Sequence, residues 1–173
     1  MSAEPAVLTG AEEVRWDLSD LYPSDDALAA DLDLAEADAL ALAGRYRGTL
    51  ATLDAATLAE AFAALAEVHD RAGRAYTYAY LAWSTDTESA EAGARLQRVR
   101  EAYSRIGQEL LFVDVEWARM DPEHTRALIE EDVLAPYRHY LELKTEARDH
   151  VLSEPEERIL SEKSVTGWSA WNR

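Results

Sequence analysis

The sequence predicts an all-α protein, a bundle of about six helices of which two are long and packed antiparallel. Alanine and leucine are abundant, whereas only seven glycines and five prolines occur in 173 residues, a composition that favours helices over strands. Apolar residues recur every three or four positions over long stretches, and helix-capping residues stand just before several of them. These two patterns place each helix in turn.

Residues 1–23 show no helical periodicity, so we expect an extended N-terminal arm followed by a helical domain over 24–173. Ser24, with two aspartates directly after it, is a good N-cap with acids in the first turn. Gly44 is placed to end this first helix, and a short loop follows. The apolar stripe of this helix, between Ser24 and Gly44, consists of Leu28, Leu32, Ala35, Ala39 and Leu42.

Asp54 is predicted to cap the second helix, which runs to about Ser84 and tolerates Gly73 inside it. One face of this helix collects its apolar residues within about 40° on a helical wheel. These residues are Leu58, Phe62, Leu65, His69, Ala72, Tyr76, Tyr80 and Trp83.

The third helix has the most regular pattern, because its apolar spacings alternate between three and four without a break. Such a stripe predicts nearly antiparallel packing on the neighbouring helix, at about 20°. Leu111 and Phe112 fall off the stripe, so we expect the C-terminal end of this helix to be buried on more than one side. The stripe consists of Leu96, Val99, Tyr103, Ile106, Leu110, Val113, Trp117 and Met120.

Two shorter helices are expected next. Asp121 before Pro122 is an N-cap with proline at the first helical position, and it starts a short fourth helix. The fifth helix is predicted to begin near Pro136 and to end near His150. Its inward residues are expected to be Tyr137, Tyr140 and Leu141.

A capping box, formed by Ser153 and Glu156, predicts the start of a sixth helix. A glycine turn at Gly167 follows, and then Trp168 and Trp171 stand at the end of the chain. Two tryptophans with no later helix to cover them are unusual, and the family resemblance given below offers an explanation.

The net charge of −17 disfavours nucleic acid and anionic membranes as partners, since both are bound by clustered lysine and arginine. Solubility is the simplest explanation of the acidity. The chain has no cysteine, which excludes disulfides and thiol catalysis. Neither a signal peptide nor an apolar run of about 20 residues is present, so we expect a cytoplasmic protein. Fifteen arginines against two lysines suggest a bacterial gene rich in GC.

The four histidines do not form a metal-binding motif. Neither the His-Glu-x-x-His pattern of zinc peptidases nor the Glu-x-x-His pattern of di-metal bundles surrounds His69, His124, His139 or His150. We interpret His69 as a core histidine bonded to a neighbour; the alternative is a buried ligand or base. His150 is expected at a helix C-terminus, where the dipole favours a cation.

The segment "YTYAYLAW" is open to an aromatic-cage interpretation. On a helix, however, Tyr78 points almost opposite to Tyr76, so we expect Tyr76, Tyr80 and Trp83 to be core residues with polar tips at the edge. Tyr78 is the residue expected to contact something else.

Paired carboxylates at Glu142 and Glu146 are interpreted as a solvated face, because Lys144 and Arg148 interleave with them. The serines lack a base and an orienting group nearby, and no strand precedes a glycine-rich phosphate loop. We therefore predict no catalytic, cofactor-binding or metal-binding residue in this chain.

Five segments together resemble the N-terminal part of oligoendopeptidase F, within the thimet-oligopeptidase-like zinc metallopeptidases. They are "RWDLSDLYPS", "YRG" at Tyr46–Gly48, "YAYLAWSTDT", "LAPYRHYLE" at Leu134–Glu142 and "HVLSEPEERILSEKSVTGWSAW" at His150–Trp171. The last segment is the most specific, with matching positions at His150, Leu152, Ser153, Glu156, Glu157, Leu160, Gly167 and Trp171.

This resemblance implies a helical region that forms one wall of a deep channel. The family's catalytic half, with its His-Glu-x-x-His helix and third carboxylate ligand, would lie beyond Arg173. There a zinc-bound water attacks short peptides with the motif glutamate as general base. The resemblance thus implies zinc in the missing half, no cofactor in this chain, and no activity of the chain alone. It also implies that the domain is truncated and that Trp168 and Trp171 lead into further helices.

Two functional hypotheses remain: this N-terminal segment of a zinc oligoendopeptidase, or a free-standing acidic helical scaffold or peptide-binding module. The second would need a polar surface where a catalytic half docks, and the off-stripe apolar residues Leu111, Phe112, Trp168 and Trp171 argue against it. A metal-storage bundle fails on ligand spacing. Exposed apolar residues promote association, so we expect self-association through the end of the third helix and the last twenty residues.

Overall fold

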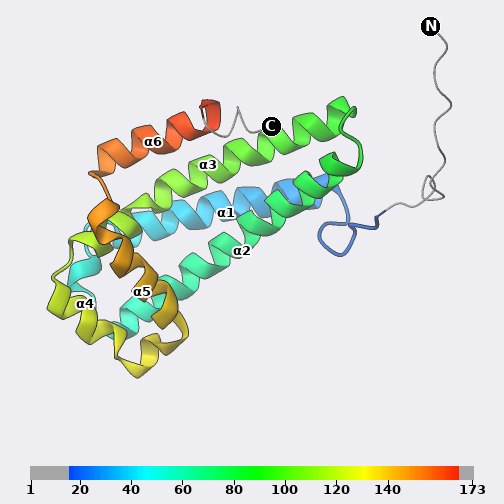
Figure 1. The fold of residues 1–173 in the computed structure, drawn as a ribbon. Coiled ribbons are helices and arrows are strands. Elements are labelled where there is room, and N and C mark those ends of the chain that lie inside the picture. The colour runs from blue at the N-terminus through cyan, green and yellow to red at the C-terminus, as the bar shows by residue number, and fades with distance from the viewer. Residues whose placement is uncertain (1–15, 168–173) are drawn as a thin grey trace, which may run out of the picture.

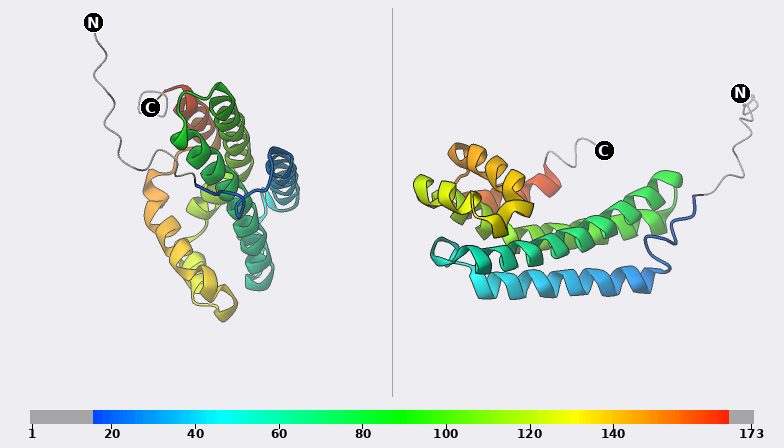
Figure 2. Two further views of the ribbon diagram at one scale, coloured as in Figure 1. Left: turned by 90° about the vertical axis from the view of Figure 1, so that its right-hand side faces the viewer. Right: turned by 90° about the horizontal axis from the view of Figure 1, so that it is seen from below.

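A computed structural model describes residues 16–167, which form helices joined by turns, with no strand in this range (Figure 1). The three long helices each pack against the other two, and three shorter helices lie on the side of α2 and α3 that faces away from α1 (Figure 2). The six helices are α1 (Asp25–Tyr46), α2 (Ala55–Thr85), α3 (Ala90–Arg119), α4 (Pro122–Ile129), α5 (Arg138–Glu146) and α6 (Glu154–Thr166). The predicted all-α bundle is confirmed.

Short 3₁₀ turns join the helices at three places. They are Leu50–Thr52 between α1 and α2, Asp132–Tyr137 before α5, and Ala147–His150 after it. The predicted fifth helix over about 136–150 is therefore an α-helix of nine residues between two 3₁₀ turns. Its inward residues are as expected: Leu141 is fully buried, and Tyr137 and Tyr140 pack on Phe62 at ring distances of 5.8 and 6.0 Å.

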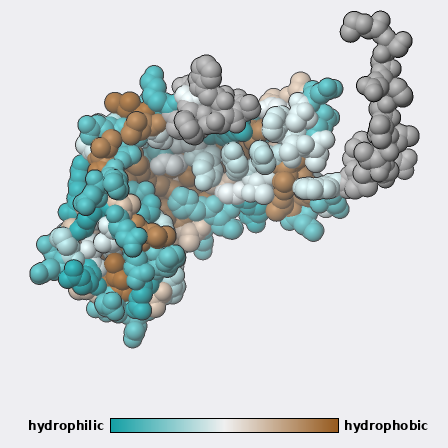
Figure 3. All heavy atoms as spheres, viewed as in Figure 1, coloured by the Kyte–Doolittle hydropathy of each residue, from teal (hydrophilic) through white to brown (hydrophobic). Residues whose placement is uncertain are grey.

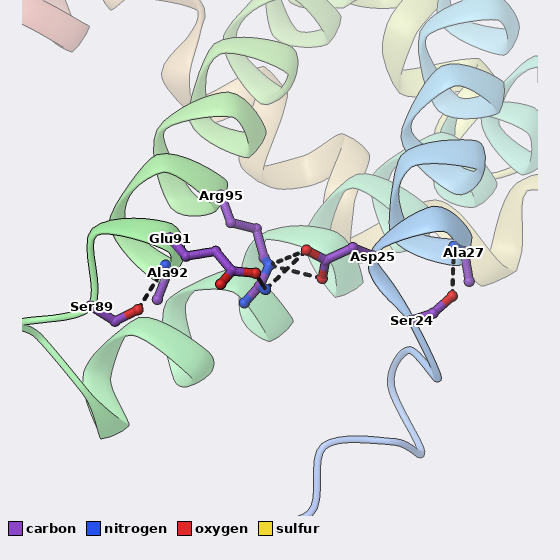
Figure 4. Close-up of polar contacts among 7 residues, drawn as sticks. All are labelled: Ser24, Asp25, Ala27, Ser89, Glu91, Ala92 and Arg95. Atoms are coloured by element: carbon purple, nitrogen blue, oxygen red, sulfur yellow. Dashed lines mark hydrogen bonds and ion pairs between the residues drawn. The ribbon is translucent and has the colours of Figure 1, made fainter.

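A side-chain cap begins each of the three long helices, at the predicted residue for α1 and α2 and at Ser89 for α3. Ser24 and Ser89 each accept a hydrogen bond of 3.2 Å from a backbone N–H three residues on, and Asp54 accepts one of 2.8 Å. Figure 4 shows the first two caps together with Arg95 of α3, which donates to Asp25 of α1 at 2.9 and 3.0 Å. Ser24 and Ser89 thus start α1 and α3, and the Arg95–Asp25 pair ties the two starts together.

Gly44 does not end α1, contrary to the expectation. The helix continues to Tyr46, and the chain turns instead at Gly48, whose φ of 82° lies in the left-handed region that favours glycine. Tyr46 is buried and packs into the core. Burial of this aromatic ring outweighs the helix propensity cost of about 1 kcal/mol at Gly44.

Two apolar clusters hold the three long helices together. The larger lies where α4 and α5 cover α2 and α3, and it contains Phe62 and Trp117, whose rings meet edge to face at 6.1 Å. The smaller, at the other end, includes Tyr22 from the N-terminal arm. Most predicted stripe residues are buried, but Tyr80 and Tyr103 are exposed by 44% and 42%.

Alanines take the inner positions that the sequence assigned to tyrosines. Ala75 and Ala79 are fully buried in the smaller cluster, because a small side chain lets three helices approach closely there. The expectation of a tyrosine core is therefore wrong at Tyr80 and Tyr103, which stand at the rim of the α2–α3 interface.

The C-terminal end of α3 is buried on more than one side, as predicted. Phe112, Val113, Val115 and Trp117 are all buried, and the guanidinium of Arg47 lies 5.5 Å from the ring centre of Phe112. The suggestion that Phe112 offers apolar surface to a missing half is therefore wrong, since this chain covers Phe112 itself.

Candidate functional site

The antiparallel register of α2 and α3 determines which side chains of the two helices lie opposite each other. Phe62 contacts Trp117, and Tyr76 contacts Tyr103 at a ring distance of 5.6 Å. The second pair is fourteen residues later on α2 and fourteen earlier on α3, so one register relates both pairs.

Four rings line the α2–α3 interface on the side away from α1. Tyr76 stacks on Tyr80 at 6.4 Å with an interplanar angle of 6°, and Tyr80 lies 6.2 Å from Trp83. Tyr103 reaches this row from α3. We refer to Tyr76, Tyr80, Trp83 and Tyr103 as the aromatic face. It is a partly exposed apolar surface rather than the core that the sequence predicted.

Tyr78 lies on a different side of α2, as predicted from the helical period. Its ring meets Tyr22 edge to face at 5.4 Å, and Arg95 lies 5.9 Å from its centre. Tyr78 therefore fastens the N-terminal arm and α3 to α2. The three tyrosines and one tryptophan of the segment do not converge on a common cavity, which removes the cage interpretation.

Two glycines interrupt the α2–α3 surface next to the aromatic face. Gly73 is one turn before Tyr76, and Gly107 is one turn after Tyr103. In the register described above, the two glycines stand at the same level. A Cβ atom built on either would meet nothing within 4 Å, so bare backbone with free space lies here. We refer to Gly73 and Gly107 as the glycine notch.

His69 lies beyond the notch, toward α5. Lys144 of α5 pairs with Asp114 of α3 at 2.5 Å and lies 5.2 Å from the ring centre of Tyr140. Desolvation lowers the pKa of His69, helped by the Lys144 cation and opposed by Asp114. Burial, together with Asp114, raises the pKa of Tyr140.

His69 is thus not the bonded core histidine that the sequence predicted. The residue is exposed, although neighbouring side chains desolvate its ring. No group of three histidine, aspartate or glutamate side chains suited to a metal gathers within the described residues, and Lys144 already occupies Asp114. These residues do not fit a zinc site.

The other candidates from the sequence lie apart from one another on the surface. His124 and His150 are exposed, and His150 ends a 3₁₀ turn as expected for a helix-end residue. His139 lies 4.0 Å from Glu142. Glu142 and Glu146 are exposed, in agreement with the solvated-face interpretation.

The two bases expected to interleave with these glutamates point inward instead. Lys144 pairs with Asp114, and Arg148 donates to the backbone oxygen of Met120 at 2.9 Å. Both fasten the α5 region to α3. Sequence spacing alone could not show this, because it does not specify which neighbour a helix packs against.

α6 packs on α3. Ser153 and Glu156 form the predicted capping box. The half-buried residues of α6 include Glu154, Glu157 and Ser161, which share one face of the helix. Exposed apolar residues stand elsewhere on and before the helix: Leu152 at 45%, Ile159 at 57% and Leu160 at 54%. Figure 3 shows the resulting apolar patch over α6.

Trp168 and Trp171, for which the sequence shows no covering helix, lie outside the described residues. None of the described helices is both long and apolar enough to cross a membrane.

Comparison with known proteins gives related sequences and a similar fold. A family model described as Oligopeptidase F matches residues 116–173. The chain is 31% identical over 161 residues to Oligopeptidase PepF of Bacillus subtilis (strain 168), which covers 92% of this chain and 24% of that protein. The chain thus spans about a quarter of the length of this relative.

A crystal structure of a protein from Chlamydophila abortus, described as a peptidase, has a similar fold. The TM-score is 0.63 with 22% sequence identity, and the match covers 89% of this chain and 27% of that one. At this identity the likeness concerns the fold alone.

Proposed function

We propose that this chain belongs with the N-terminal region of the oligopeptidase F family and is the non-catalytic helical segment of a zinc-dependent oligoendopeptidase that cleaves short peptides. In this proposal it forms one wall of the substrate channel, acts in the bacterial cytoplasm and is inactive alone. The observation that carries the proposal is the relation to a curated oligopeptidase along 92% of this chain.

The residues present suggest which part of the catalytic work this chain would do and which part the rest of the enzyme would do. The described part of the chain offers no set of ligands for zinc, so the metal and the water that it activates would belong to the rest of the enzyme. This chain's contribution would be shape and positioning. A rigid wall limits which peptides reach the catalytic centre, and effective positioning is a large part of enzyme catalysis.

The surface supports a segment that packs against further polypeptide. Leu152, Ile159 and Leu160 are each about half exposed on one short stretch, and neighbouring apolar residues of this kind mark interaction sites. A free-standing acidic scaffold would be expected to have polar residues at these positions. The exposed apolar patch therefore favours the oligopeptidase segment over the scaffold.

A direct assay tests the proposed absence of activity. The purified 173-residue chain, shown to be helical by circular dichroism, is incubated with zinc and an internally quenched peptide. We expect no hydrolysis above the blank. Hydrolysis that a chelator abolishes, and that persists through further purification, would overturn the proposal.

A further inference from the structure

The aromatic face and the glycine notch are neighbours on the α2–α3 interface. Tyr80 and Tyr103 are exposed by 44% and 42%, and Gly107, one turn after Tyr103, is exposed as well. A Cβ atom built on Gly73 or Gly107 would meet nothing within 4 Å, so the helix backbone is open to close approach there. We refer to the aromatic face and the glycine notch together as the aromatic strip.

An arginine without a partner borders this strip on α3. Arg100 lies three residues before Tyr103 and seven before Gly107, so the three share one face of the helix. It is half-buried, and its side chain makes no hydrogen bond, ion pair or ring contact with the described part of the chain. By contrast, Arg95 and Arg105 of the same helix each pair with a carboxylate of α1. Arg100 thus offers a free charge that is complementary to a carboxylate.

The strip has the length of a short peptide segment. Trp83 follows Gly73 by ten residues of α2, which is about 15 Å at 1.5 Å per helical residue. An extended chain covers this length with about five residues. In the antiparallel register, Arg100 stands close to the level of Tyr80, between the two ends of the strip. A peptide lying along the strip would therefore place a side chain, rather than its terminus, near the guanidinium.

Each part of the strip suits one part of such a peptide. The rings can pack against large apolar or aromatic side chains, and the glycines allow a peptide backbone to approach closely. Arg100 can hold one carboxylate through two parallel hydrogen bonds. A single arginine in a chain with a net charge of −17 does not suit nucleic acid, which is bound by clustered basic residues.

We propose that the aromatic strip binds a short extended peptide in which an acidic side chain is flanked by large apolar ones. The apolar side chains pack on the aromatic face, the peptide backbone crosses the glycine notch, and the aspartate or glutamate carboxylate pairs with Arg100. This inference rests on the proposed function, which assigns short peptides as substrates of the complete enzyme. It adds a side-chain preference and the surface that would select for it.

Synthetic peptides test the proposal with the 173-residue chain, since the measurement requires no hydrolysis. The probe is a fluorescein-labelled pentapeptide, Leu-Phe-Glu-Phe-Ala, followed by fluorescence anisotropy as the chain is added. Its C-terminus is amidated, so that only the glutamate can pair with Arg100. We expect saturable binding, and we expect the peptide with glutamine in place of glutamate to bind about tenfold more weakly, as for the loss of a hydrogen bond between charged groups.

Two variants and a matched control identify the surface. Gly107→Leu fills the notch where a Cβ meets nothing, and it should weaken both peptides at least about fivefold through steric overlap. Arg100→Gln should weaken the glutamate peptide about tenfold and change the glutamine peptide by no more than about twofold. Arg98→Gln removes the same charge on the opposite side of α3 and should change neither. Circular dichroism checks that each variant is folded.

Absence of saturable binding would overturn the proposal, as would equal effects of Arg100→Gln and Arg98→Gln on the glutamate peptide. A folded Gly107→Leu variant that binds both peptides like the parent would also overturn it. The proposed function is decided separately, by hydrolysis in an enzyme that contains this chain. An active enzyme together with no binding here would refute the peptide site alone, whereas binding together with an inactive enzyme would refute the proposed function alone.

Discussion

At the residue scale, three polar side chains fasten the N-terminal arm to the bundle. The Tyr22 hydroxyl donates to Asp31 at 2.5 Å, and Arg74 pairs with the same carboxylate at 2.8 Å. Burial works against the charge of Asp31, but the hydrogen bonds from Tyr22 and Arg74 prevail and lower its pKa. The arm residues next to the first helix are thus part of the folded domain.

Tyr22→Phe removes this hydroxyl while keeping the ring. We expect the free energy of unfolding to fall by about 1.5 kcal/mol, the usual range for a hydrogen bond to a charged group, measured by urea denaturation. Tyr80→Phe, at an exposed ring, is the matched control and should stay within about 0.5 kcal/mol of the parent. An equal effect of the two substitutions would contradict the role of the Tyr22 hydroxyl.

The same carboxylate gives a pH dependence with a definite sign. Because the pKa of Asp31 is lower in the folded state than its ordinary 3.8, its contribution to stability is present above 3.8 and is lost as the pH falls through the folded value. Tyr22→Phe should therefore also flatten the acid limb of the stability curve.

His69 provides a second test at this scale. Its pKa lies below the ordinary 6.5 through desolvation and the Lys144 cation, so protonation favours the unfolded state, and stability decreases as the pH falls through 6.5. Lys144→Met should raise the pKa of His69, followed by NMR titration of the ring protons. Lys163→Met on α6 removes a lysine charge elsewhere and serves as the control. An equal rise of the His69 pKa in this variant would mean that the nearby charge of Lys144 is not the cause.

At the element scale, capping residues were the most reliable guide, because a cap is decided by neighbours within one turn. Ser24, Asp54, Ser89 and Asp121 all cap helices, three of them as predicted. Ser89 follows a loop that the sequence left without an assigned cap. Helix ends were less predictable, as Gly44 shows, since the burial of a residue further on decides where a helix stops.

The two glycines near the end of α1 distinguish a glycine that the turn requires, Gly48, from one that merely lies inside the helix, Gly44. Gly48→Ala should destabilise the protein by about 1 kcal/mol, because an alanine at positive φ is strained. Gly44→Ala should instead stabilise it by up to about 1 kcal/mol, since the site is helical and a Cβ meets nothing there. Thermal unfolding of the two variants measures the sign of each change in stability. Two changes of the same sign would contradict the assignment of the turn to Gly48.

At the scale of the whole molecule, the sequence predicted the architecture but not the surfaces. The three- and four-residue spacings placed every long helix, because burial of one face is a property of the helix itself. Which side α6 turns toward α3 depends on distant residues. The sequence accordingly placed the exposed apolar surface partly at Phe112, whereas the described residues expose it on α6.

The surface expected to mediate self-association is therefore smaller than the sequence indicated. We expect weak association of the 173-residue chain, seen by sedimentation velocity, through Leu152, Ile159 and Leu160. Replacing Ile159 and Leu160 by glutamine should reduce it, whereas Leu40→Gln should not, although Leu40 and Ile159 are both 57% exposed. Reduction by Leu40→Gln alone would assign the contact to α1 instead.

The central claim is that this chain is the N-terminal segment of an oligopeptidase and supports catalysis carried out elsewhere. The most direct measurement replaces the matching quarter of the Bacillus subtilis relative with this chain and compares peptide hydrolysis by the chimera and by the relative lacking that quarter. The account predicts that the chimera hydrolyses short peptides in a chelator-sensitive way and that the deletion does not. A folded chimera as inactive as the deletion would contradict it.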